Sequence, residues 1–286
     1  MRQNYFFLLF LLFSFGEMNF SFASDTVSIR DAIDKGIISA IVKNTGGHSD
    51  ECIEITIENK LGEDMILSIE AGRKMISEDT AMQDIMVTRQ YAFLLSKTEK
   101  AKLKLFGMCI RAHRRSPAKD SKFSVGKMAD SLLVQLARFI DKFNYRNGTS
   151  QNAVWVLSDG NSLESVYSES NDATGKKLLE FMHILTKKPF PWYTLEYQKD
   201  TVILFTGKPK TLHGYYNYFV QNNSVVTIGI YKEDGHLQAI LFSQRTHNPG
   251  KYDYPFTLDV SKWKKGNYFL KFYVDDQVKE KKLITL

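Results

Sequence analysis

The sequence predicts an α+β protein that is mainly β, with two β-sandwich modules of which the first carries helices on one flank. Three observations lead to this fold class. Apolar and polar residues alternate from Ile53 to Ile110, an amphipathic helical pattern follows, and alternating runs return from Thr201 to Leu286. A period of two is typical of half-buried antiparallel strands, and spacings of three and four are typical of helices. We expect the first sandwich and its helices within residues 24–190 and the second sandwich within residues 191–286.

The first 23 residues have the composition of a secretory signal peptide. Arg2 gives a basic start, residues 6–15 form an apolar run, and Ala23 is a small residue suited to a cleavage site. The run is shorter than the roughly 20 apolar residues that span a bilayer, and no later stretch is long enough. We therefore expect an exported protein of the periplasm, the cell surface or the medium, with no transmembrane segment in the mature chain.

Length and charge limit the functional classes. The mature chain exceeds the usual size of a single domain, which favours two. The formal net charge is +6 at pH 7 and the pI is near 9.0, but lysines are mixed with acidic residues throughout. The densest basic stretch, residues 111–119, contains no aromatic residue. A nucleic-acid site combines a basic patch with recognition elements, so we predict no nucleic-acid partner.

The strand candidates of the first module follow one another closely. Ile53, Ile55 and Ile57 alternate with polar residues, a polar turn follows at 59–64, and Ile66 and Ile69 resume the pattern. Short strands separated by polar turns at this spacing are typical of a β-sandwich.

Two helices are predicted after these strands, at 125–148 and 173–188. The face of the first is formed by Met128, Leu132, Leu136, Phe139, Ile140 and Phe143, and the face of the second by Leu178, Phe181, Met182 and Leu185. We interpret both faces as core contacts, because the neighbouring sheet needs a cover. Pro189 and Pro191 then end the helical region and mark the boundary between the modules.

The C-terminal module contains two hairpin candidates. Asp234-Gly235 separates two apolar-rich runs, and Asp275-Asp276 separates two more. With Pro249-Gly250 before a strand, the run KKGNYFLKF and a lysine-rich last strand, these features resemble the immunoglobulin-like domain shared by the flagellar hook-capping protein and the C-terminal modules of many Bacteroidetes-type secreted proteins. The resemblance implies an immunoglobulin-like β-sandwich. Such modules sometimes act as export or surface-sorting signals.

The first module contains a second resemblance. The segments MCI at 108–110 and QNAVWVLSDG at 151–160 are similar to thioester domains of Gram-positive adhesins, where a cysteine at the end of a strand is joined to a glutamine that opens a short helix. By this resemblance Cys109 supplies the thiol, Gln151 supplies the amide, and Trp155 shields the bond from water. The implied function is an internal thioester that acylates an amine on a partner surface.

Alternatives exist for both residues. In an exported protein, the two cysteines Cys52 and Cys109 are most simply a disulfide, and one sulfur cannot be in two bonds. Cys109 is therefore in a disulfide, free, or in a thioester. Without a thioester, Gln151 is a polar residue in the first turn of a helix that Ser150 caps. Alternatively, residues 152–157 form a buried strand.

No other motif indicates chemistry. We find no nucleophile elbow, no phosphate-binding glycine loop and no histidine at metal-ligand spacing. We therefore predict no metal, no cofactor and no catalytic residue. The predicted function is an exported, non-catalytic binding or assembly protein of the cell envelope or surface, with a protein or polysaccharide as partner. The alternatives are a covalent adhesin that uses Cys109 and Gln151, and an exported hydrolase of unrecognised type.

Overall fold

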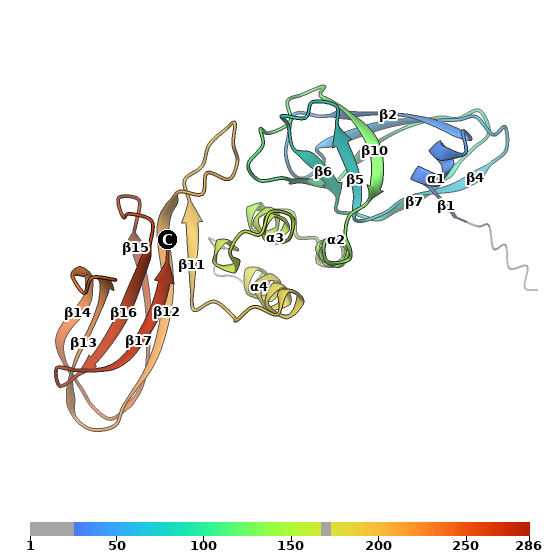
Figure 1. Cartoon of the computed structure of the whole chain (residues 1–286). Coiled ribbons are helices and arrows are strands. Elements are labelled where there is room, and N and C mark those ends of the chain that lie inside the picture. The colour runs from blue at the N-terminus through green and yellow to red at the C-terminus, as the bar shows by residue number, and fades with distance from the viewer. Residues whose placement is uncertain (1–25, 167–172) are drawn as a thin grey trace, which may run out of the picture.

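The structure is a computed structural model that describes residues 26–166 and 173–286. The predicted signal peptide lies outside the described residues. The described chain is mainly β, with several sheets in sandwich-like arrangements and few helices, as the sequence predicts (Figure 1). Among these residues, the helices are all too short or too polar to cross a membrane.

The first module consists of two sheets. In spatial order, the strands of the larger sheet are β8 (Lys100–Leu105), β3 (Ile53–Asn59), β2 (Ile38–Asn44), β10 (Lys122–Met128), β5 (Arg73–Ser77), β6 (Asp84–Val87) and β9 (Gly107–Ile110). The smaller sheet contains β1 (Val27–Ser28), β4 (Met65–Ile69) and β7 (Tyr91–Leu95), and the short helix α1 (Ile29–Asp34) follows β1. Ile53, Ile55 and Ile57 are fully buried in the core of this module. The predicted alternation is therefore confirmed in β3, whose inward face consists of these isoleucines.

Strand β9 lies at one edge of the larger sheet, and its free edge meets the loop at 48–50. The N–H of Gly107 donates to the Asp50 carbonyl at 2.9 Å, and the N–H of Cys109 donates to the His48 carbonyl at 3.2 Å. Glycine is required at 107, because a Cβ there would lie 2.5 Å from the Cγ2 of Ile85. These contacts fix the position of Cys109.

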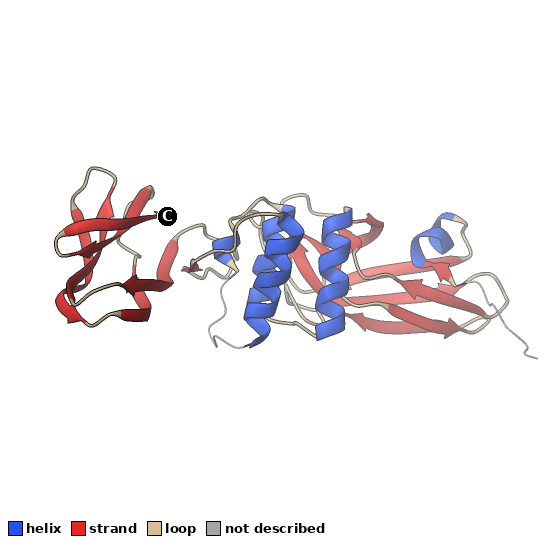
Figure 2. Ribbon diagram, turned by 90° about the horizontal axis from the view of Figure 1, so that it is seen from below, coloured by secondary structure: helices blue, strands red, loops and turns tan. Residues whose placement is uncertain are grey.

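Helices α2 (Ser131–Phe143), α3 (Gly148–Ser158) and α4 (Ala173–Thr186) form a layer between the first module and the C-terminal sandwich (Figures 1 and 2). Helix α2 begins after Asp130, whose side chain accepts the N–H groups of Leu132 and Leu133. The predicted face of this helix is partly wrong. Met128 belongs to strand β10, because the helix starts only at Ser131. Leu132 is 40% exposed, because the buried face of the helix is formed by Leu133, Leu136, Ala137 and Ile140.

Residues 148–158 form a helix, so the alternative of a buried strand is wrong. The predicted N-cap, Ser150, is also wrong. Asn147 caps the helix, because its side chain accepts the N–H of Ser150 at 3.1 Å. One side of α3 packs in a core shared with α2 and α4, while Trp155 packs in the core of the first module. Helix α3 therefore joins the helical layer to the first module.

The C-terminal module is a sandwich of two sheets. The three-stranded sheet contains β11 (Tyr193–Tyr197), β12 (Pro209–Val220) and β15 (Gly250–Asp259), and the four-stranded sheet, in spatial order, contains β14 (Leu237–His247), β13 (Ser224–Lys232), β16 (Asn267–Val274) and β17 (Gln277–Thr285). Both predicted hairpins are confirmed as the pairs β13–β14 and β16–β17. Stacked aromatic rings, such as those of Tyr216 and Tyr218, fill the space between the sheets.

The loop at 198–208, between β11 and β12, reaches back to the first module. The carbonyl of Val202 accepts the N–H of Ser116 at 2.8 Å. Phe205 is 8% exposed and packs in the core of the first module, with its ring 5.9 Å from that of Trp155 and 4.8 Å from that of Tyr197. This loop brings residues of the C-terminal half next to α3.

Candidate functional site

The two residues that the sequence pairs, Cys109 and Gln151, are in direct contact. The Oε1 atom of Gln151 accepts the Cys109 N–H at 3.0 Å, and its Nε2 donates to the Cys109 carbonyl at 2.7 Å. Gln151 is 3% exposed and lies in the first turn of α3. Its carboxamide therefore binds the edge of β9 as a neighbouring strand would, through the main chain of Cys109.

The two cysteines are both free and buried, so the structure does not contain the predicted disulfide. The Cys52 thiol donates instead to the carbonyl of Gly107 at 3.5 Å. Both cysteines lie in the core of the first module, and Cys52 contributes to the rise in the pKa of the Cys109 thiol.

Both thiols are poor nucleophiles in this environment. Burial raises the pKa of Cys52 to about 12. Burial, followed by the nearby Cys52 and Asp84, raises the pKa of Cys109 well above its ordinary value. A thiol attacks a carbonyl as its thiolate, and these shifts keep the thiolate population low at neutral pH.

Two arginines of the basic stretch after Cys109 form ion pairs with aspartates in the segment 79–84. Arg111 forms an ion pair with Asp84 at 2.9 Å, and Arg115 forms one with Asp79 at 3.4 Å. Arg114 donates to the carbonyl of Thr80. These contacts hold residues 111–115 against residues 79–84, and the guanidinium of Arg111 binds a carboxylate.

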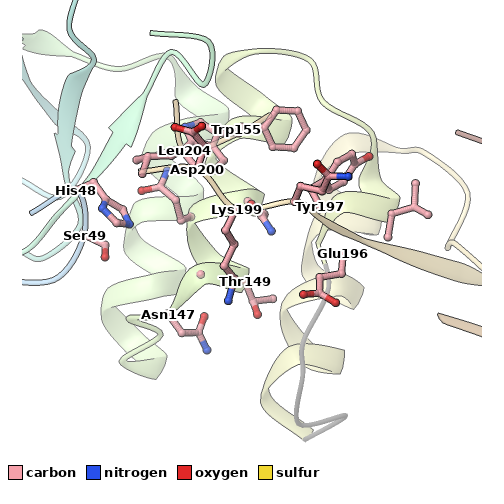
Figure 3. Close-up of a pocket in the computed structure, with 16 residues that line it drawn as sticks. His48, Ser49, Asn147, Thr149, Trp155, Glu196, Tyr197, Lys199, Asp200 and Leu204 are labelled. Atoms are coloured by element: carbon pink, nitrogen blue, oxygen red, sulfur yellow. The ribbon is translucent and has the colours of Figure 1, made fainter. Parts of the chain in front are cut away.

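A cleft of about 600 Å³ opens beside Gln151 (Figure 3). Three segments that are distant in the sequence form it: the loop with His48 and Ser49, helix α3 up to Trp155, and the segment 195–205 from β11 and the loop that follows. Gln151 and Trp155 both line it from α3. The cleft therefore leads to the carboxamide that contacts Cys109.

The cleft presents neutral hydrogen-bonding groups. The side chains of His48, Ser49 and Gln198 have no hydrogen-bond partner among the described residues, and Nε1 of Trp155 is buried without one. Burial lowers the pKa of His48, so its imidazole is neutral at pH 7. Unpaired polar groups in a concave site are available to a ligand.

The acidic side chains of the cleft are engaged locally. Glu196 pairs with Lys210 at 3.2 Å, and Asp200 accepts the N–H groups of Val202 and Ile203. Burial acts to raise the pKa of Glu196, but its polar contacts together outweigh burial and lower the pKa. At Asp200 the two N–H groups lower the pKa against a smaller effect of burial. The carboxyl group of Glu196 therefore stabilises strand β11 at the wall of the cleft, and that of Asp200 stabilises the loop at 198–208.

Sequence reasoning found two residues of this site and missed the rest. Gln151 and Trp155 belong to a motif, whereas His48, Ser49 and Gln198 lie in loops without one. These loops come together only through the long-range topology of the chain. The local periodicity of the sequence does not predict that topology. Among the described residues, no group of three or more His, Cys, Asp or Glu side chains is arranged to hold a metal ion.

Comparisons with protein-family models, with curated proteins and with solved structures found no match. The resemblances to thioester domains and to the immunoglobulin-like module stay predictions.

Proposed function

We propose that the chain is an exported, non-catalytic binding or assembly protein of the cell envelope or surface, and that the cleft beside Gln151 is its ligand site. The observation that carries this proposal is the set of neutral, unpaired side chains in the cleft, His48, Ser49 and Gln198. A protein that leaves polar groups unpaired in a concave site gains their hydrogen bonds only when a ligand arrives.

The chemistry of the cleft favours a ligand rich in hydroxyl or amide groups. Imidazole, hydroxyl and carboxamide groups line the cleft together with the rings of Trp155 and Phe205. Such groups bind a sugar chain or an extended peptide by hydrogen bonds together with apolar contact. This matches a polysaccharide or protein partner.

The proposal is tested with glycan and peptide arrays probed with the full mature chain and with a His48→Ala/Gln198→Ala variant. Neither side chain has an internal partner, so the double variant should fold like the parent. We expect at least one sugar or peptide to bind the parent and to lose at least tenfold in affinity with the variant. Gln135→Ala, on the exposed face of α2, is the control. Equal signals for the parent and the double variant would contradict the proposal.

A second candidate, covalent adhesion, is favoured by one observation. The cleft reaches Gln151, and the carboxamide of Gln151 lies against Cys109. In the required step, the Cys109 sulfur bonds to the Cδ of Gln151, the Cδ–Nε2 bond breaks, and ammonia leaves with the thiol proton. An amine of the partner then displaces the sulfur, which forms an amide and restores the thiol.

Two features oppose this step. The carboxamide is hydrogen-bonded to the main chain of Cys109, and the raised pKa of the thiol disfavours attack. The intact mass of the mature chain separates the two functions. A loss of about 17 Da, recovered as an adduct with methylamine, would establish the thioester. An unchanged mass with two titratable thiols would exclude it.

A further inference from the structure

The outward face of the four-stranded sheet is apolar over much of its area. Ile230, Leu270 and Ile284 are fully buried in the sandwich core, so their sequence neighbours point to the opposite side. Two rows of cross-strand neighbours cross this side, which we call the outer face: Leu237, Tyr231, Phe269 and Leu283 in the first row, and Ile240, Gly229, Lys271 and Lys281 in the second. The three aliphatic side chains Leu237, Ile240 and Leu283 are each about half exposed.

Two lysines of like charge lie directly opposite each other on the outer face. Lys271 on β16 pairs in register with Lys281 on β17. The ammonium of Lys271 lies 4.5 Å from the ring centroid of Tyr231, and that of Lys281 lies 3.6 Å from the ring centroid of Phe269. Neither lysine forms an ion pair with a described residue. Like charges at opposed positions destabilise a sheet, so the protein holds an uncompensated cationic pair inside an apolar surface.

The acidic residues of this segment face other partners. Residues 261–286 contain seven lysines and three acidic residues. Asp275 accepts the N–H of Val225, and Asp276 accepts from the amide of Gln244. Glu280 accepts from the hydroxyl of Tyr216, which is fully buried. Glu280 also pairs with Lys282 of the same strand at 3.8 Å, so these acidic residues leave Lys271 and Lys281 without an ion pair.

The loop before β16 adds two further cations. Lys264 and Lys265 are exposed, form no ion pair with a described residue, and precede the strand that contains Phe269. The apolar first row thus lies between the Lys271–Lys281 pair on one side and the end of the sheet near Lys264 and Lys265 on the other. A partner that fits must offer negative charge and an apolar layer together.

From this combination we infer that the outer face docks on an anionic phospholipid surface. Lysines close to such a surface interact with the headgroup phosphates, and half-exposed aliphatic and aromatic side chains enter the boundary between headgroups and acyl chains. An acidic glycan would satisfy the lysines but would leave Leu237, Ile240 and Leu283 without an apolar partner. The cleft takes its residues of this module from β11 and the loop after it, whereas the outer face belongs to the four-stranded sheet, so the two sites are separate.

The test is sedimentation of the full mature chain with vesicles. We expect binding to vesicles of phosphatidylcholine and phosphatidylglycerol at about three to one, weak binding to phosphatidylcholine alone, and a loss of affinity as salt rises. Each lysine near an anionic surface contributes about fivefold to the affinity. Lys281→Glu changes the charge by two units and should lower the affinity about 25-fold.

The same variant separates docking from folding. Lys281→Glu removes the cation–π contact with Phe269 but replaces a repulsive cross-strand pair by an attractive one, and because the two effects are of similar size its melting temperature should stay close to that of the parent. Lys251→Glu, an equal charge change at an exposed position of β15 in the other sheet, is the matched control and should lower the affinity far less. Leu237→Ser should also weaken binding to the anionic vesicles, without any change of charge.

Three outcomes would overturn the inference. The first is no binding to the anionic vesicles at low salt, and the second is a loss of affinity with Lys251→Glu as large as that with Lys281→Glu. The third is complete displacement of the protein from the vesicles by dilute soluble alginate, which would indicate a glycan. The array experiment on the cleft does not depend on any of them, so failure of this inference and failure of the proposed function are distinguishable.

Discussion

The carboxamide of Gln151 pairs with the main chain of Cys109 through two hydrogen bonds, although the residues are 42 positions apart. This contact gives the main-chain N–H and C=O of Cys109, at the edge of β9, a hydrogen-bond partner, and it holds α3 against the first module. It therefore gives Gln151 a structural role that does not need a covalent bond.

The contact predicts a large effect of Gln151→Ala. The Cys109 N–H keeps the His48 carbonyl as partner, but the Cys109 carbonyl loses its donor in a buried site. A buried polar group left unpaired costs about 1–3 kcal/mol, so we expect the free energy of unfolding to fall by about 2 kcal/mol. Urea unfolding measures the change, with Gln135→Ala as the control. A loss below about 0.5 kcal/mol would show that the contact is weak.

Gln151→Glu should destabilise the protein further at neutral pH, because the introduced carboxylate faces the carbonyl oxygen of Cys109. Its folded-state pKa would be raised, since only the protonated form can donate to that carbonyl. The variant should therefore recover stability relative to the parent as the pH falls through this raised pKa. Unfolding curves of both proteins between about pH 4 and pH 7 would reveal the recovery, and a constant difference would argue against it.

The two buried thiols predict a specific labelling pattern. Native protein should not react with iodoacetamide at neutral pH, because Cys52 and Cys109 are at most 1% exposed and their pKa values are raised. Protein unfolded in urea without a reductant should take up two labels per chain. Mass spectrometry counts them. No label before reduction and two afterwards would restore the disulfide that the sequence predicts.

Periodicity predicted the elements of this fold well, and it failed where a boundary depends on capping. The alternation at 53–57 and the two C-terminal hairpins reappear as β3, β13–β14 and β16–β17. The start of α3 was wrong, because Asn147 and Ser150 are both good cap residues and only the three-dimensional contact distinguishes them.

The candidate site was predicted only in part, for a related reason. The Cys109–Gln151 pairing came from a resemblance, and the structure places the two residues in contact. The resemblance did not indicate that the main chain of Cys109 receives the carboxamide. The other wall of the cleft depends on the loop that contains Gln198 and Phe205, whose path is set by tertiary packing.

Alkaline pH should destabilise the C-terminal sandwich. Burial is the largest cause that raises the pKa of Tyr193 to about 12, and its hydroxyl is held at the main chain of Thr285. The unfolded value is about 10, so the folded-state pKa lies above it. The contribution of Tyr193 to stability is thus fully present below about pH 10 and is lost as the pH rises towards 12. Tyr193→Phe should show a smaller decrease in melting temperature between pH 10 and pH 12, and an equal decrease would exclude this assignment.

Phe205→Ala should loosen the loop at 198–208 and open the cleft. Phe205 contacts the rings of Trp155 and Tyr197 in the core of the first module, and replacement of a buried phenylalanine by alanine typically costs about 3–5 kcal/mol. We expect the lower end of this range, because the affected loop lies at the surface and can relax. Limited proteolysis should cut the variant at 198–208 before the parent. Phe190→Ala, at a position that is 44% exposed, is the control and should leave both stability and cleavage nearly unchanged. If the two variants were cleaved at the same rate, Phe205 would not be the residue that holds the loop to the first module.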